Sequence, residues 1–178
     1  GLYATIAIQA ALRHRDATGQ GQHIDCALLD SAVAILANQG ANYLVGGIVP
    51  GPMGNAHPNV VPYPPFRAAG GDVIVAVGND GQFRALCRIA GRPDLAPDPA
   101  YATNALRNAN RAVLEAALEE AIARCPREHL LAQMEEAGVP GGPMNRLDQV
   151  YADPQVVARG MVGTIARAGG AGDLAVTR

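Results

Sequence analysis

The sequence has 178 residues, of which 49% are hydrophobic, while only 4% are aromatic and tryptophan is missing. A chain of this length can enclose a core, and alanine, valine and leucine must fill it, as in α/β packing of small helices on a sheet. The formal net charge of −2 argues against a nucleic-acid partner, and no apolar run reaches the ~20 residues that cross a bilayer.

The N-terminal quarter contains both helical and strand patterns. Residues 1–15 carry apolar side chains on one side, which predicts a helix that begins without a cap. The apolar alternation over residues 24–28 predicts a strand. Asp30 and Ser31 are suitable caps for a second helix that runs to about Leu44.

Glycine and proline interrupt the pattern from Gly46 to Phe66. A segment this long without periodicity is typical of a functional loop or of a linker. Its glycines match no phosphate-binding fingerprint, because no lysine follows them and no strand directly precedes them. They favour a loop with positive φ angles, whose backbone can approach a neighbouring group closely. A lid over a ligand and a plain linker both remain open at this point.

The rest of the chain alternates short strands with helices. Gly138 ends one of the helices, residues 139–145 are expected to form a turn, and residues 168–178 are expected to be irregular. We expect strands at Val73–Val77 and Met161–Ala166, and helices at Asp80–Ala90, Asn110–Arg124, Pro126–Ala137 and Pro154–Arg159.

Residue chemistry alone does not name a reaction. His57 is a lone loop histidine, a position that more often carries a hydrogen-bonding residue than a general base. Ser31 matches no nucleophile motif and is better explained as a helix cap. The three cysteines are spaced too widely for a metal site or a disulfide framework, so we expect buried, reduced thiols: Cys26, Cys87 and Cys125.

Four collinear segments carry a resemblance to a known family. They are GQGQHIDCALLDS at residues 19–31, GNAHPNVVPYPPF at residues 54–66, VGNDGQFRALCRIAGRPDL at residues 77–95, and AGVPGGPMNRLDQVYADPQVVARGMV at residues 137–162. In this order they resemble the C-terminal portion of family III (CaiB/BaiF-type) CoA-transferases, over almost the whole chain up to Val162.

The resemblance implies transfer of coenzyme A from an acyl-CoA donor to a carboxylic acid acceptor. An aspartate attacks the donor thioester and forms a mixed anhydride, which CoA thiolate converts to an enzyme–CoA thioester. By analogy, that aspartate lies about four residues before Gly1, one helical turn away. We therefore expect a fragment that is inactive alone and has no catalytic residue of its own.

The resemblance also assigns binding roles. Four residues correspond to the loop that covers the nucleophile and shields the anhydride from water, and one lines the acyl pocket. Pro64 departs from the glutamine of many relatives, which puts a side-chain contact at that position in doubt. The implied site residues are Gly51, Gly54, Asn55 and His57 in the loop and Leu28 at the acyl pocket.

The implied fold is α/β, with part of a Rossmann-like large domain and a smaller α+β domain. Residues 1–45 would belong to the large domain, 46–72 to the active-site loop and linker, 73–145 to the small domain, and 146–178 to a segment that returns toward the large domain. The resemblance further implies a cytoplasmic, interlocked homodimer, so we expect apolar surface left open in this chain.

The implied ligands are acyl-CoA and a carboxylic acid, with no metal, no permanently bound cofactor, no nucleic acid and no membrane. The loop region favours dicarboxylate users such as succinyl-CoA-dependent enzymes. Two alternatives remain, an α-methylacyl-CoA racemase-like enzyme of the same superfamily and a non-catalytic binding or assembly fragment.

Overall fold

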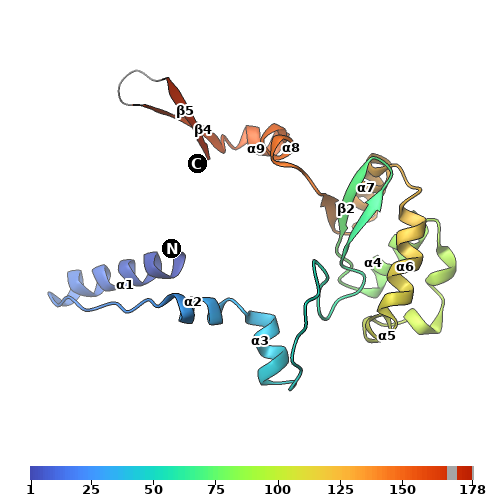
Figure 1. Ribbon diagram of the computed structural model, residues 1–178, viewed down its shortest axis with the longest axis horizontal. Coiled ribbons are helices and arrows are strands. Elements are labelled where there is room, and N and C mark those ends of the chain that lie inside the picture. The colour runs from blue at the N-terminus through green and yellow to red at the C-terminus, as the bar shows by residue number, and fades with distance from the viewer. Residues whose placement is uncertain (168–171, 178) are drawn as a thin grey trace. The chain divides into compact units, whose positions relative to one another are not determined.

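The computed structural model describes residues 1–167 and 172–177 (Figure 1). Helices and small sheets follow one another along the chain, which confirms the mixed α/β class. Internal contacts divide the chain into two compact units, Gly1–Pro52 and Met53–Arg178.

The first unit begins with the expected helix. Helix α1 spans Leu2–Thr18 and ends at Gly19, whose left-handed φ of 75° lets its N–H bind the carbonyl of Arg15. The strand expected over residues 24–28 is wrong, because residues 20–27 form no regular element. A strand needs a hydrogen-bonded neighbour, and none of the described strands pairs with this segment.

The second helix expected in this unit is divided in two. Helix α2 spans Leu28–Ala34 and helix α3 spans Ala37–Leu44, with Ala37 at a φ of 39° at the break. Asp30 and Ser31 both lie inside α2 and neither caps it, which corrects the sequence-based assignment. The Oγ of Ser31 donates to the carbonyl of Ala27 at 3.1 Å, the local bond that hydroxyl side chains make inside helices.

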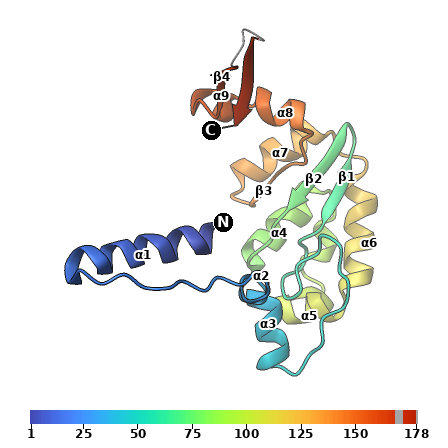
Figure 2. The same ribbon diagram turned by 60° about the vertical axis from the view of Figure 1, so that its left-hand side comes forward.

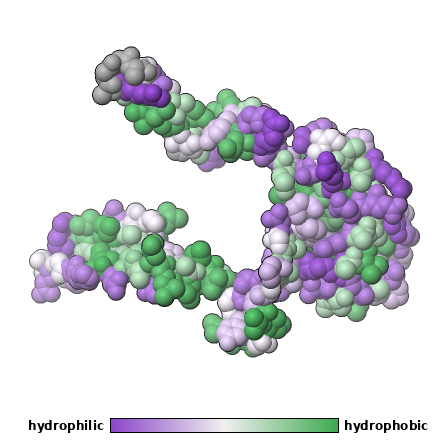
Figure 3. All heavy atoms as spheres, viewed as in Figure 1, coloured by the Kyte–Doolittle hydropathy of each residue, from purple (hydrophilic) through white to green (hydrophobic). Residues whose placement is uncertain are grey.

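Apolar side chains of the first unit are widely exposed. None of residues 1–52 is buried, and large apolar side chains such as Leu2 and Leu44 face solvent. Figure 3 shows these hydrophobic residues in green on the surface of α1 to α3. Open apolar surface was expected here, but Cys26 was expected to be buried and is exposed.

The second unit is built on a three-stranded antiparallel sheet in the order β1-β2-β3. Strand β1 spans Pro65–Ala68, β2 spans Gly71–Val75 and β3 spans Gly141–Pro143. The expected strand at residues 73–77 therefore begins and ends earlier. The strands that pair with β2, namely β1 and β3, lie in segments expected to be irregular. Glycine and proline are uncommon inside strands, so these segments carry no strand pattern.

Helices pack on this sheet as expected. Helix α4 spans Asp80–Ile89, α6 spans Arg111–Ile122 and α7 spans Arg127–Glu136, and α6 lies beside β1 (Figure 2). Helix α5, Asn104–Ala109, and the short 3-10 turns Pro93–Leu95 and Pro99–Tyr101 were not expected. The largest buried apolar residues are Phe66, Phe83, Leu86, Leu114, Leu118, Ile122, Leu130 and Met134.

The C-terminal segment contains two short helices and a hairpin. Helices α8, Leu147–Ala152, and α9, Pro154–Ala158, precede strand β4 at Val162–Ala166. Strand β4 pairs with β5, Asp173–Thr177, so the expectation of an irregular end is wrong for these residues. Residues 168–171 and 178 lie outside the described residues.

Within residues 1–167 and 172–177, no helix is both long enough and apolar enough to span a bilayer. Cys87 is buried, as expected, and burial raises the pKa of its thiol to about 11. Cys125 is half-buried.

Candidate functional site

The backbone of residues 57–62, which we call the anchored segment, is held by polar side chains of α5 and α6. Asn104, the first residue of α5, binds it twice. Its amide Nδ2 donates to the carbonyl of Asn59 at 2.7 Å, and its Oδ1 accepts the N–H of Val61 at 3.1 Å. This pairing satisfies one backbone donor and one backbone acceptor in a stretch that has no regular secondary structure.

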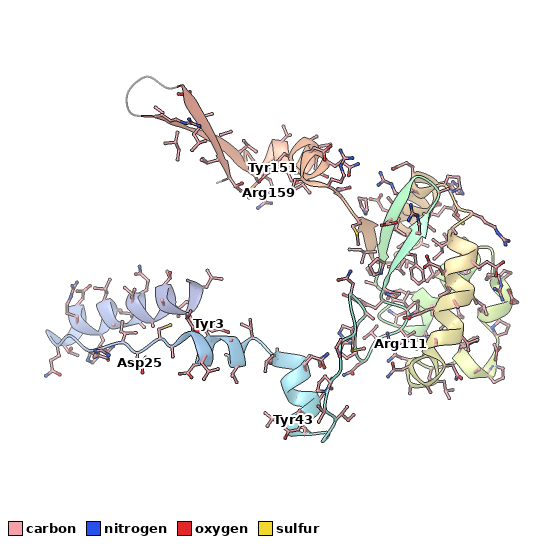
Figure 4. All side chains as sticks on the ribbon, in the orientation of Figure 1. Tyr3, Asp25, Tyr43, Arg111, Tyr151 and Arg159 are labelled. Atoms are coloured by element: carbon pink, nitrogen blue, oxygen red, sulfur yellow. The ribbon has the colours of Figure 1, made fainter. Side chains whose placement is uncertain are left out.

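Arg111, the first residue of α6, holds the beginning of the anchored segment (Figure 4). Its Nη2 lies 2.7 Å from the carbonyl oxygen of His57 and 3.3 Å from that of Pro58. Asn108 accepts from the same nitrogen at 2.8 Å, and Glu115 pairs with Nη1 at 3.3 Å. Burial raises the pKa of Glu115, and the neighbouring Arg111 opposes that rise.

Arg107 holds the other end of the anchored segment from inside the core. Its side chain is fully buried, and Nε donates to the carbonyl of Val61 at 2.9 Å while Nη1 donates to that of Tyr101 at 3.1 Å. The guanidinium carbon lies 4.6 Å from the ring centre of Phe83. Nη2 lies 2.8 Å from Oδ1 of Asp80. The two groups form an ion pair, but their relative orientation is not that of a hydrogen bond.

His57 is fixed by its neighbours. Its ring centre lies 5.0 Å from that of Tyr63, and its Nδ1 accepts the N–H of Asn59 at 3.1 Å. A neutral ring that accepts at Nδ1 carries its proton on Nε2. This arrangement makes His57 a hydrogen-bonding residue of the loop, the role that residue chemistry favoured.

The glycines expected in the loop differ in conformation. Gly54 has a left-handed φ of 59°, and a side chain built on it would meet nothing within 4 Å. Gly51 is not left-handed, whereas Gly47 is, with a φ of 67°, so the expectation of positive φ holds at Gly47 and Gly54 but not at Gly51. Asn55 follows Gly54 in the same turn and is exposed, and Ala56 N–H closes that turn on the carbonyl of Met53 at 3.2 Å.

Leu28 opens helix α2 in the first unit, where its side chain is 90% exposed. A cavity of about 310 Å³ lies between α1, α2 and the segment before α2, and Leu28 does not line it. Tyr3, Asp25 and Asp30 do, and Tyr3 and Asp25 are labelled in Figure 4. The sequence singled out none of these three as a site residue, since no catalytic motif contains them. No group of three or more potential metal ligands converges within the described part of the chain.

Comparison with known proteins assigns the family. The model of CoA-transferase family III matches residues 1–178. The chain belongs to CoA-transferase family III. It is 48% identical to a succinate–glutarate CoA-transferase of Agrobacterium fabrum over 161 residues, and 41% identical to human succinyl-CoA:glutarate CoA-transferase over 162 residues. These alignments cover 90% and 91% of this chain but only 40% and 37% of the relatives' length.

Solved structures of similar proteins confirm the fold. A CaiB/BaiF family protein from Brucella suis is 47% identical, with a TM-score of 0.74 over all of this chain and 50% of its own. The Rv3272 protein of Mycobacterium tuberculosis is 27% identical, with a TM-score of 0.80 over 97% of this chain and 44% of its own. The chain therefore corresponds to part of the family III fold.

Proposed function

We propose that the protein to which this chain belongs transfers coenzyme A from an acyl-CoA donor to a carboxylic acid acceptor. The observation that carries the proposal is the family match over residues 1–178. It is supported by relatives that are named CoA-transferases and align along 90% or more of this chain. Because the chain spans about two fifths of their length, the activity belongs to the whole protein rather than to these residues alone.

The chemistry follows from a carboxylate nucleophile. An aspartate about one helical turn upstream of Gly1 attacks the donor thioester and releases CoA thiolate, which leaves a mixed anhydride. The thiolate attacks the aspartyl carbonyl, frees the donor acid and forms an enzyme–CoA thioester. The acceptor carboxylate then displaces the thiolate to form a second anhydride, and CoA returns to the acceptor acyl group.

Dicarboxylic acids are the substrates that we propose. The relatives from Agrobacterium fabrum and human are named for succinate or succinyl-CoA and glutarate, and a Haloarcula marismortui relative is named for succinyl-CoA and mesaconate. We also propose a cytoplasmic homodimer, in which the exposed apolar residues of α1 to α3 are covered by the rest of the protein and its partner. No permanently bound cofactor is part of this proposal.

The experiment that tests the function uses the full-length protein. We expect CoA to move from succinyl-CoA to glutarate, and we expect replacement of the upstream aspartate by asparagine to reduce transfer by about 10⁴-fold or more, as loss of a nucleophile does. Mass spectrometry of the wild type incubated with donor should detect CoA bound through a thioester to that aspartate. Absence of both transfer and adduct with every dicarboxylate tried would contradict the proposal.

The loop residues receive their role within this proposal. Gly51, Gly54, Asn55 and His57 form a lid that keeps water from the anhydride, and Leu28 borders the acyl pocket. The left-handed turn at Gly54 and the open space beside it support this assignment, because a backbone without a side chain can approach a reacting group closely.

Replacing Gly54 by valine should raise donor hydrolysis relative to transfer in the full-length protein. A β-branched residue at a φ of 59° is strained by roughly 1–3 kcal/mol, so the turn will rearrange and admit water. The measurement is the ratio of free acid to acceptor-CoA formed from the same donor.

The matched control is Gly91→Val. Gly91 has a φ of 70° and equally open surroundings, but it follows α4, away from the loop in sequence. It should incur the same strain without a change in the product ratio. An unchanged ratio in Gly54→Val would mean that the loop is only a connector.

A further inference from the structure

Side chains of α5 and α6 bind the backbone of the anchored segment, and the N–H of Val77 donates to the carbonyl of Pro62 at its end, at 3.2 Å. Three side chains from distant parts of the sequence bind this segment: Asn104, Arg107 and Arg111. Their acceptors and donors are all backbone groups of residues 57–61. These three side chains therefore hold residues 57–61 through backbone groups, whatever side chains those residues carry.

Arg111 differs from the other two in its position and its exposure. Arg107 is buried in the core, where its loss would disturb the fold, whereas the side chain of Arg111 is 20% exposed at the beginning of α6. It binds the carbonyls of His57 and Pro58, which are three and four residues from the left-handed turn at Gly54. Arg111 is thus the anchor nearest to the glycines of the loop.

The guanidinium group is itself held in place. Asn108 binds it from one turn earlier, in α5, and Glu115 binds it from one turn later, in α6. These two contacts orient the guanidinium group independently of the loop. A planar guanidinium with several fixed donors can bind two neighbouring carbonyls, which an ammonium group does with less geometric control.

We propose that Arg111 is a positioning residue for the transfer reaction. By holding the carbonyls of His57 and Pro58, it fixes the C-terminal end of the loop so that the turn at Gly54 closes in one position. This inference rests on the proposed function. Arg111 touches no reacting atom, and it acts through the backbone of the loop.

The first arm of the test measures the position of the loop in the full-length protein, with a readout that does not depend on activity. Two amides of the anchored segment are hydrogen-bonded, that of Asn59 to Nδ1 of His57 and that of Val61 to Oδ1 of Asn104. In Arg111→Met, hydrogen–deuterium exchange at these amides should accelerate by about tenfold or more, the effect of losing a hydrogen bond from a charged donor. Amides of α4 should not change. Unaltered exchange at Asn59 and Val61 would overturn the inference.

The second arm measures the reaction in the full-length protein. Arg111→Met should raise the ratio of donor hydrolysis to transfer by at least about tenfold. Arg111→Lys should give a ratio between those of the wild type and Arg111→Met. This ratio separates positioning from a structural role, because unfolded molecules catalyse neither reaction and so leave the ratio unchanged. A ratio equal to that of the wild type would also overturn the inference.

The matched control is Arg124→Met. Arg124 lies just beyond the other end of α6 in an exposed ion pair with Glu120, so the same charge is removed without touching the loop. A ratio that rises equally in this variant would trace the effect to net charge and would overturn the inference. If the wild type transfers no CoA at all, the proposed function fails, and the exchange arm still decides whether Arg111 positions the loop.

Discussion

Replacing Arg107 by methionine is expected to destabilise the second unit by about 2–5 kcal/mol, because each buried acceptor left without its charged donor costs about 1–3 kcal/mol. The variant leaves the carbonyls of Val61 and Tyr101 without their donor and Asp80 without its cation. It also removes the cation from the face of Phe83. Small domains have only about 5–15 kcal/mol of stability, so this loss is a large share.

Urea denaturation of the 178-residue chain, followed by circular dichroism, measures the effect. Arg124→Met serves as the control, since its side chain is 76% exposed and surface ion pairs contribute at most about 1 kcal/mol. We expect the midpoint to fall in Arg107→Met and to stay near that of the wild type in the control. Equal midpoints in the two variants would show that the buried guanidinium is not what joins the anchored segment to the core.

Replacing Gly141 by alanine is expected to cost about 1–3 kcal/mol or more, the range for overpacked sites. An added Cβ would lie 2.5 Å from the carbonyl oxygen of Ile74 and would also collide with Cε of Met134. The methionine can rotate away, but the carbonyl belongs to β2 and cannot move without separating β2 from β3. The sheet must therefore distort to admit a single methyl group.

Gly142 offers a control in the same strand. A Cβ at this position would meet nothing within 4 Å, so Gly142→Ala should leave the midpoint of urea unfolding nearly unchanged or slightly raised. Thermal unfolding should rank the two variants in the same way, with Gly141→Ala less stable than Gly142→Ala. A Gly141→Ala chain as stable as Gly142→Ala would mean that β3 adjusts at little cost.

Most helices could be predicted from the sequence, because capping and periodicity are local signals, and the family was implied by the resemblance of four collinear segments. Asn79 caps α4 as its sequence suggests, with its side chain accepting the N–H of Gln82. The strands β1 and β3 could not be predicted, since each is defined by hydrogen bonds to β2 rather than by its own residues. The segment over residues 24–28 shows the converse, because its alternating pattern finds no partner strand among the described residues.

The candidate site was only partly accessible from sequence. The GNAHP motif drew attention to Gly54 and His57, but nothing local indicated that Arg111 would bind the backbone of this loop. Arginines at helix starts are common on surfaces, and a side-chain bond to a carbonyl more than fifty residues away leaves no trace in a single sequence. Pairing of this kind becomes visible only when the chain is folded.

The sheet of the second unit has a consequence for how the protein is made. Strand β3 follows α7 in the chain, yet it pairs with β2, which precedes all the helices of this unit. During synthesis on the ribosome, the β1–β2 hairpin and helices α4 to α7 emerge first, while the outer edge of β2 has no neighbour. The sheet is completed only when Gly141–Pro143 have left the exit tunnel, so release of a nascent chain before that point exposes an open edge to other chains.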